Sequence, residues 1–248
     1  MPRFSIITIT KNNPDGFAAT RDSLKVQSFT DYEWIVIDGM IEADHGIYDA
    51  MNKGLDRANG QYVIFMNAGD MFATAHTLGR IAHENADFIY GDAAEDGHIK
   101  PARHDIATGM ITHHQAMVYR RAVIGDLRYD TTYHIAADYK FTAQFLMRAQ
   151  SRAHINAPLC IFETGGLSQV KTALGRREQA IIRKELKIKA PGTLFMQAAS
   201  QILKRLLPRL YWLMRARIAG NPAGNAHIPP APAAGNPAPR RAAAEHQA

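Results

Sequence analysis

GIYDAMNKGLDRANGQYVIFMNAGD, residues 46–70, is the stretch that decides the fold. Within residues 46–60 apolar side chains recur at helical spacing, and Asn59-Gly60 is a pair typical of a helix C-terminus. The apolar run YVIFM at 62–66 then predicts a buried strand, and the polar sequence NAGD follows it directly. In open α/β sheets, ligands bind beyond the carboxyl ends of such strands.

The residues before this stretch predict a strand, a helix and a second strand. FSIITIT at 4–10 is rich in β-branched residues, and residues 16–28 carry apolar side chains among polar ones. WIVI at 34–37 is again a buried run, and Asp38-Gly39 ends it. This order is the opening of a mostly parallel α/β sheet flanked by helices.

The later part of the chain predicts further strands, then a helical extension. Helices are expected at 74–85, 137–149, 172–189 and 193–218, with a kink at Pro208, and strands at 87–90, 116–119 and 157–163. From residue 220 Pro, Ala, Gly and Asn dominate, so no core can form there. We therefore expect a domain over 1–170, a helical extension over 171–219 and a disordered tail over 220–248.

Composition and cysteine content favour a cytoplasmic globular protein. Hydrophobic residues make up 46% of the chain, and a lone cysteine, Cys160, cannot form an internal disulfide. The N-terminal apolar run is too short and too β-branched for a signal peptide. We also expect no transmembrane helix, because no stretch approaches the roughly 18 uncharged apolar residues that one needs.

The net charge of +6 is distributed unevenly along the chain. Residues 1–170 contain 15 basic and 20 acidic residues, whereas 171–218 contain 12 and 2. An acidic body argues against nucleic acid as a partner, because nucleic-acid binders carry their basic stripe on the folded domain. The basic, apolar segment 193–218 is typical of an amphipathic helix on an anionic membrane surface. It could equally form a helix pair that packs its apolar face on the body.

Three carboxylates follow predicted strands: Asp38, Asp70 and Asp92. Each one alone could be a solvated turn residue or a helix N-cap. Together at one edge of a sheet they would repel one another unless a cation or a hydrogen-bonding ligand lay between them. The sequence therefore predicts a divalent metal and a polar ligand at this edge.

Four segments together resemble the family 2 glycosyltransferases of the GT-A fold: SIITITKNN (5–13), EWIVIDG (33–39), residues 46–70 and IYGDA (89–93). The similarity extends over about residues 4–170 and is strongest to bacterial enzymes of exopolysaccharide assembly, such as the colanic-acid type. It implies a nucleotide-sugar half at about 1–93 and an acceptor half at about 94–170. It also implies inverting transfer of a sugar from a UDP- or GDP-sugar to a lipid-linked saccharide acceptor, at the inner face of the plasma membrane.

The resemblance assigns donor-side roles to seven residues. Those that would bind the nucleotide sugar are Thr10, Asp38, Asp49, Asn52, Lys53 and Asp92, and the ligand of Mn²⁺ or Mg²⁺ would be Asp70. Lys53 could neutralise the diphosphate, although a surface lysine is an equally good interpretation. A single carboxylate can suffice for the metal, because such ions complete their shell with water and diphosphate oxygens.

The resemblance also assigns acceptor-side roles. His114 and Gln115 match an H-Q-x segment that lines the pocket, and Gly166 and Ser168 match a G-G-x-S loop able to close on the donor. Asp138 matches an x-D-Y motif that supplies the catalytic base in inverting members. The alternative for Asp138 is that it only caps its helix.

The chain departs from the family pattern after Gly39. The family usually has Gly-Ser-Thr-Asp-Gly-Thr there, followed by a helix and a strand, whereas this chain has only residues 40–45. The departure leaves a second hypothesis, a catalytically impaired relative that acts as a binding or scaffolding subunit at the membrane. A sugar nucleotidyltransferase is a weaker hypothesis, because no Gly-rich basic loop follows the first strand.

Overall fold

The structure is a computed structural model that describes residues 1–165, 171–190 and 192–218. Its strands are β1 (Phe4–Thr10), β2 (Tyr32–Asp38), β3 (Tyr62–Phe65), β4 (Met71–Phe72), β5 (Phe88–Glu95), β6 (His98–Lys100), β7 (Met117–Arg120) and β8 (Arg152–Ile161). Its helices are α1 (Pro14–Lys25), α2 (Ile47–Arg57), α3 (Thr77–Ile81), α4 (Arg121–Ile124), α5 (Ala137–Arg148), α7 (Thr172–Glu185), α8 (Thr193–Leu206), α9 (Pro208–Ile218) and the short 3₁₀ helix η1 (His114–Ala116).

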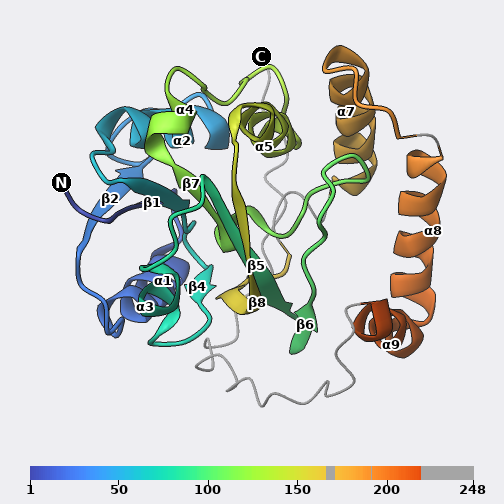
Figure 1. Cartoon of the computed structure of the whole chain (residues 1–248), viewed down its shortest axis with the longest axis horizontal. Helices are drawn as coiled ribbons and strands as arrows, with labels where there is room; N and C mark the ends of the chain where they lie inside the picture. Colours follow the sequence, from blue (N-terminus) through green and yellow to red (C-terminus); the bar gives the residue numbers. More distant parts are fainter. Residues whose placement is uncertain (166–170, 191, 219–248) are drawn as a thin grey trace, which may run out of the picture.

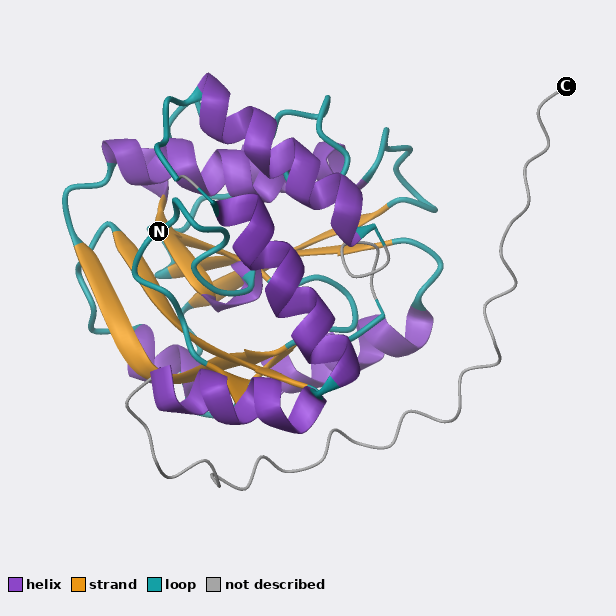
Figure 2. Ribbon diagram, turned by 90° about the vertical axis from the view of Figure 1, so that its right-hand side faces the viewer, coloured by secondary structure: helices purple, strands orange, loops and turns teal. Residues whose placement is uncertain are grey.

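One sheet runs through the molecule in the order β2-β1-β3-β7-β5-β8-β4, and β6 pairs with β5. β1 is parallel to both β2 and β3, so the expected strand, helix and strand are confirmed. Helices cover both faces of the sheet (Figure 2). Side chains of β1 alternate between two cores, because Ile7 contributes to the core beneath α2 and α5 and Ile6 to the core beneath α1 and α3.

Two antiparallel pairings bring distant loops to the same end of the sheet. β7 is antiparallel to β3, with Ile64 opposite Val118, so the residues before β7 lie beside those after β3. β4 is antiparallel to β8, with Met71 opposite Ile161, so the residue before β4 lies beside those after β8. The loops that follow β3 and β8 and the turn that precedes β7 therefore converge.

The C-terminal helices contact the body mainly through α7, which lies beside α5, and α9, which lies near β6, while α8 runs between them at the edge of the molecule (Figure 1). Ile182 of α7 is buried against Tyr139 of α5. Lys204 of α8 is 2.6 Å from Glu95 of β5, and Trp212 of α9 stacks on His98 at 4.8 Å between ring centroids. None of the helices in the described ranges has the length and apolar character needed to cross a membrane.

Four sequence predictions of element bounds are wrong. The strand expected at 87–90 continues to Glu95, so Asp92 lies within β5 and not at its end. The helix expected at 74–85 is only α3, and the strand expected at 157–163 is β8, which already begins at Arg152. The helix expected at 193–218 is one element too few, but its interruption comes at Pro208, where the kink is expected: α8 ends before this residue and α9 begins with it. The expected tail, 220–248, lies outside the described residues.

β2 is the outermost strand at its end of the sheet. A short connection, residues 39–46, leads from it to α2. Lys53 of α2 donates a hydrogen bond of 2.5 Å to the Ala43 carbonyl, and Arg57 Nη2 is 2.6 Å from Glu42 Oε2. Residues 39–46 are thus held against α2 by contacts with two of its basic side chains.

Candidate functional site

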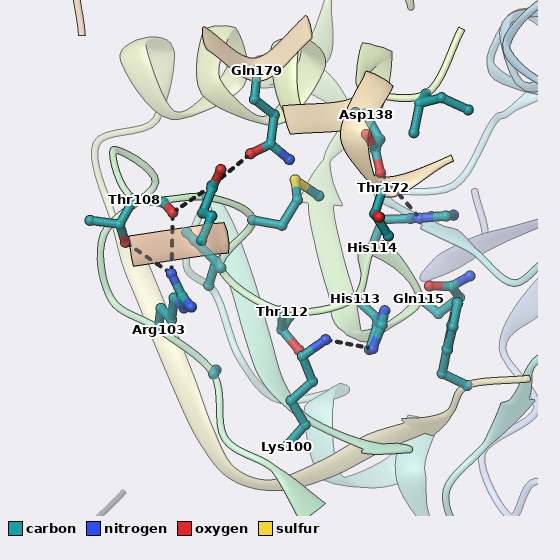
Figure 3. Close-up of a pocket in the computed structure, with 18 of the residues that line it drawn as sticks. Lys100, Arg103, Thr108, Thr112, His113, His114, Gln115, Asp138, Thr172 and Gln179 are labelled. Carbon is teal, nitrogen blue, oxygen red and sulfur yellow. Dashed lines mark hydrogen bonds and ion pairs between the residues drawn. The ribbon is translucent and has the colours of Figure 1, made fainter. Parts of the chain in front are cut away.

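A pocket of about 990 Å³ lies where these loops converge. Its walls come from residues after β3, from β5, from the segment 100–115, from the start of α5 and from α7 and α8. Ten of its residues are labelled in Figure 3, among them His114, Gln115 and Asp138, three of the residues that sequence analysis selects. Asp70 and Asp92 also line it.

Asp70 is buried at the base of this pocket. Its Oδ1 accepts a hydrogen bond of 3.0 Å from the backbone N–H of Glu163, and its Oδ2 accepts one from Gln115 Nε2. Burial raises the pKa of Asp70 from 3.8 to about 7, and the charge of Glu163 adds to this rise. The carboxyl group is therefore held in a position where a cation would strongly favour its ionised form.

The turn that carries Asp70 is fixed to α1 by a hydroxyl. Thr20 Oγ1 accepts from the backbone N–H of Gly69 at 3.0 Å and donates to the Asp70 carbonyl at 2.7 Å. Gly69 has φ +106°, which favours glycine, and a Cβ there would collide with the Glu163 carboxylate. The loop after β3 thus lies directly against the loop after β8, with two carboxylates at the contact.

This pair of carboxylates is a suitable donor set for a hard divalent cation. Mg²⁺ and Mn²⁺ prefer oxygen ligands, and Asp70 and Glu163 supply two carboxylates whose like charges would be offset by a bound cation. The described residues contain no cluster of three or more His, Cys, Asp or Glu side chains placed to hold a metal. An ion at this site would therefore need ligand oxygens from water and a bound substrate.

Asp138 occupies the second position of α5 and lines the same pocket. Its Oδ1 accepts a hydrogen bond of 2.7 Å from the backbone N–H of Tyr139, and its Oδ2 lies 3.8 Å from His114 Nδ1. The N-cap of α5 is Ala136, so Asp138 accepts this first-turn N–H from within the helix. Burial raises the pKa of Asp138 from 3.8 to about 6, which leaves a carboxylate that ionises close to neutral pH.

The N-terminus of α5 is held by Glu178 of α7, a residue that sequence analysis does not select. Its buried carboxylate accepts three backbone N–H groups, from His134 at 3.0 Å and from Ile135 and Ala136 at 2.8 Å each. All three donors precede the first helical residue, Ala137, so these bonds fix the turn that leads into α5. α7 thereby fixes the position from which Asp138 enters the pocket.

A second polar group lies along the wall formed by β5. Glu95 Oε2 is 3.0 Å from His113 Nε2 and 3.1 Å from Lys100 Nζ, and its other oxygen pairs with Lys204 of α8. These partners hold the pKa of Glu95 far below its usual value despite burial. Elsewhere on this wall Asp92 Oδ1 accepts from the backbone N–H of Ala102 at 2.8 Å.

Five residues expected to bind the donor lie outside the lining of this pocket. Thr10 and Asp38 are paired at the ends of β1 and β2, as expected, but Asp38 accepts from the backbone N–H of Met40. Asn52 bonds to the backbone of Tyr129: its Nδ2 donates to the Tyr129 carbonyl at 2.9 Å, and its Oδ1 accepts from the Tyr129 N–H at 2.8 Å. Asp49 and Lys53 face the connection between β2 and α2.

Asp44 lies against Gly39, whose backbone N–H donates to the Thr10 carbonyl at 2.9 Å. A Cβ at Gly39 would collide with the Asp44 carboxylate, and Lys11 Nζ is 3.6 Å from Asp44 Oδ1. The donor-side roles of the five residues outside the pocket remain predictions. The loop of Gly166 and Ser168, expected on the acceptor side, lies outside the described residues.

Comparison with known proteins identifies the family. No model of a known protein family matches the sequence. A PGL/p-HBAD biosynthesis glycosyltransferase of Mycobacterium tuberculosis is 30% identical over 203 residues, which cover 67% of this chain and 79% of the relative. The chain belongs to the glycosyltransferases.

Two solved structures share the fold of this glycosyltransferase. S. aureus TarS 1–349 in complex with UDP has a TM-score of 0.58 at 18% identity, covering 84% of this chain and 72% of that one. This chain spans 43% of a longer TarS chain. The mannosyltransferase PcManGT from Pyrobaculum calidifontis, in complex with GDP-Man and Mn²⁺, has a TM-score of 0.53 at 13% identity, covering 88% and 85%. Both similarities confirm the GT-A type of α/β fold, and at these identities they show the fold alone.

The mycobacterial relative contains residues in the matched region that this glycosyltransferase lacks. The alignment spans 203 positions but only 67% of the 248 residues here. The short connection 39–46 is where sequence analysis expects a missing helix and strand. Because β2 is the outermost strand, such a unit would extend the edge of the sheet and leave the core unchanged.

Proposed function

We propose that this glycosyltransferase transfers a sugar from a UDP- or GDP-sugar to a hydroxyl of a lipid-linked saccharide, with inversion, in the synthesis of a bacterial exopolysaccharide or cell-surface polysaccharide. The observation that carries the proposal is the arrangement of Asp70, Glu163 and Asp138 around one pocket of about 990 Å³. This volume suits a nucleotide sugar together with part of an acceptor. TarS with UDP and PcManGT with GDP-Man support a nucleotide-sugar donor.

The proposed reaction is a single displacement. Asp138 takes the proton of the acceptor hydroxyl as the acceptor oxygen forms a bond to the anomeric carbon. The bond from that carbon to the diphosphate oxygen breaks, and its electron pair leaves with the nucleoside diphosphate. A pKa of about 6 suits this role, because Asp138 is then ionised at neutral pH and still basic enough to accept a proton.

Asp70 and Glu163 are the residues that would hold a divalent metal. The Mn²⁺ bound with GDP-Man in PcManGT supports this assignment. When bound, the ion would offset the charge that develops on the departing diphosphate. Gln115 orients the Asp70 carboxylate by its hydrogen bond to Oδ2, and the backbone of Glu163 fixes Oδ1.

The two faces of α8 support a lipid-linked acceptor. Gln197, Ser200 and Gln201 line the pocket from the inner face. Phe195, Ile202 and Leu206 lie on the opposite face by helical spacing, and their side chains are 79%, 59% and 69% exposed. A helix that points its apolar face away from the protein is suited to the interface of a membrane.

Exposed basic residues near this face favour an anionic membrane. Lys187, Lys189, Arg205 and Arg209 are exposed, and the segment 171–218 contains ten more basic than acidic residues. An acceptor could then place its saccharide in the pocket while its lipid stays in the bilayer beside α8. We accordingly propose peripheral binding at the inner face of the plasma membrane.

The second candidate function is a binding or scaffolding subunit without catalysis. The specific observation that favours it is Asp44, whose carboxylate lies against Gly39 beside Thr10 and Asp38, where the nucleotide base is expected. The two candidates differ in donor binding, because a scaffold has no need to retain a nucleotide.

Calorimetry of UDP and GDP binding, with and without Mn²⁺, tests the proposal on the full chain. We expect one nucleotide to bind in a metal-dependent manner and Asp70→Ala to abolish that dependence. Asp31→Ala, at an exposed position, serves as the matched control and should bind like the unchanged protein. Absence of binding by either nucleotide would favour the scaffold.

A further inference from the structure

His114 lies between two polar side chains of the pocket. Its Nε2 is 3.1 Å from Asn67 Nδ2, and its Nδ1 faces Asp138 Oδ2 at 3.8 Å (Figure 3). The structure places the amide nitrogen of Asn67 toward the ring, and since an amide nitrogen can only donate, Nε2 is the acceptor in this arrangement. The single proton of the neutral imidazole ring therefore lies on Nδ1, the nitrogen that faces Asp138.

The ring is neutral in the physiological range. Burial lowers the pKa of His114 from 6.5 to about 3, and neighbouring His113 lowers it further. A histidine that stays neutral and already carries its proton on Nδ1 cannot take a proton at that nitrogen. It can only donate a hydrogen bond from it.

We propose that His114 is a positioning residue, which donates its Nδ1–H to Asp138 Oδ2 and is itself held in the required tautomer by Asn67. This inference rests on the proposed function, in which Asp138 is the base. The separation of 3.8 Å is longer than a hydrogen bond, and such catalytic contacts commonly shorten when substrate binds. With Tyr139 N–H on Oδ1, both carboxylate oxygens then have a donor, and the plane of the carboxylate is fixed toward the acceptor.

Two tyrosines near Asp138 use their hydroxyl groups elsewhere: Tyr48 Oη donates to the Ile135 carbonyl at 2.7 Å, and Tyr119 Oη pairs with Thr142 Oγ1 at 2.9 Å. Burial raises the pKa of both phenols, and that of Tyr129, above the usual value, so none of the three adds a charge beside Asp138. Glu178 of α7 has no proton to donate, because both oxygens of its carboxylate accept hydrogen bonds, from three backbone N–H groups. A change in the titration of Asp138 after substitution of His114 would therefore come from the loss of the ring.

Nitrogen-15 NMR of the histidine rings in the full chain tests the tautomer without any assay of activity. We expect His114, assigned by its disappearance in His114→Phe, to show the Nδ1–H form at pH 7 and not to titrate between pH 5 and 8. Asn67→Ala should shift it toward the Nε2–H form, which free histidine prefers. An Nε2–H ring in the unchanged protein, or a ring that titrates near 6.5, would overturn the inference.

Kinetics then test the positioning role. With UDP-glucose and GDP-mannose as the donor probes, His114→Phe should lower kcat by about tenfold to a hundredfold with little change in the donor KM. It should also move the acidic limb of the pH profile upward, because the carboxylate loses a donor. His114→Asn places an N–H near the Nδ1 position and should restore most of the rate. The exposed His83→Phe is the matched control and should leave the profile unchanged.

The two experiments separate two kinds of failure. In one case the unchanged protein transfers sugar from neither donor, yet NMR shows His114 with its proton on Nδ1 and a shift of that proton in Asn67→Ala. The proposed function has then failed, whereas the inferred arrangement of the side chains stands. If the protein is active and His114→Phe has the kcat and pH profile of His83→Phe, the positioning role is wrong.

Discussion

The backbone N–H of Glu163 donates a hydrogen bond of 3.0 Å to Asp70 Oδ1, although 93 positions separate the two residues in the chain. The antiparallel pairing of β4 with β8 brings them together, because Asp70 precedes β4 and Glu163 follows β8. The Glu163 side chain turns back over Gly69, so its charge lies near Asp70. This contact joins the two halves of the chain at the pocket.

The raised pKa of Asp70 predicts a pH-dependent stability. Its protonated form is favoured in the folded state, so stability is full below about pH 4 and is lost as pH rises toward 7. With a pKa of about 7 in place of 3.8, the loss amounts to about 4 kcal/mol. Asp70→Asn removes the ionisation. In metal-free buffer its Tm should exceed that of the unchanged protein at pH 8 by far more than at pH 4.

The control for this experiment is Asp31→Asn, at an exposed carboxylate. We expect its Tm to vary with pH as in the unchanged protein. If Asp70→Asn shows that same dependence, ionisation of Asp70 does not limit the stability of the fold.

Asp138→Asn should abolish sugar transfer and retain the donor. The amide fits the same volume but cannot accept the proton of an acceptor, so we expect kcat to fall by about a hundredfold or more. Nucleotide affinity, measured by calorimetry, should stay within about twofold, because Asp70 and Glu163 are unchanged. Asp126→Asn removes an exposed carboxylate that pairs with Arg148 and should keep full activity. Transfer at a normal rate by Asp138→Asn would require another base.

Substitution of the outer face of α8 should weaken membrane binding. Each of Phe195, Ile202 and Leu206 contributes about 1.5–3 kcal/mol when buried, so changing all three to Ser should lower the affinity for vesicles containing phosphatidylglycerol by at least about tenfold. Flotation of vesicles with bound protein measures this. Ser at Met40 and Ile41, which are also exposed, should leave binding intact. Equal binding by both variants would place the membrane contact elsewhere.

Loss of Glu178 should destabilise the protein more than loss of an exposed acidic residue. Glu178→Ala leaves the buried backbone N–H groups of Ile135 and Ala136, and the part-buried one of His134, without their acceptor, which costs about 3 kcal/mol. Glu185→Ala removes the contacts of an exposed carboxylate with Lys140 and Tyr133, and because Lys140 keeps its ion pair with Asp130 the change should cost about 1 kcal/mol or less. Urea unfolding followed by circular dichroism compares them, and equal costs would contradict the importance of the Glu178 contacts.

The sequence predicts the first half of the fold well because its signals are local. The apolar runs at 4–10 and 62–66 and the helix that ends near Asn59-Gly60 are all found within a few residues of their expected bounds. The far end of β5 is missed because Gly91 and Ala93 are poor strand formers by themselves. Pairing with β7, β6 and β8 stabilises the strand.

The candidate site is only partly predictable, because its two halves come from long-range pairings. Asp70, Gln115 and Asp138 are found through motifs, and the structure brings them to one pocket. No spacing rule connects Glu163 or Glu178 with residues so far away in the chain. Asn52 is the opposite case, since the motif predicts a role in donor binding but its side chain bonds to the backbone of Tyr129.

Because β2 is an edge strand, the connection after Gly39 is a position where a further helix and strand could be inserted. A helix and strand transplanted from a longer relative between Gly39 and Gly46 would add one strand outside β2 and disturb none of the existing pairings. The inserted helix and strand would also replace the segment that holds the Asp44 side chain against Gly39. The edge of the sheet beside β2 could thus be rebuilt while the pairings from β1 to β8 stay as they are.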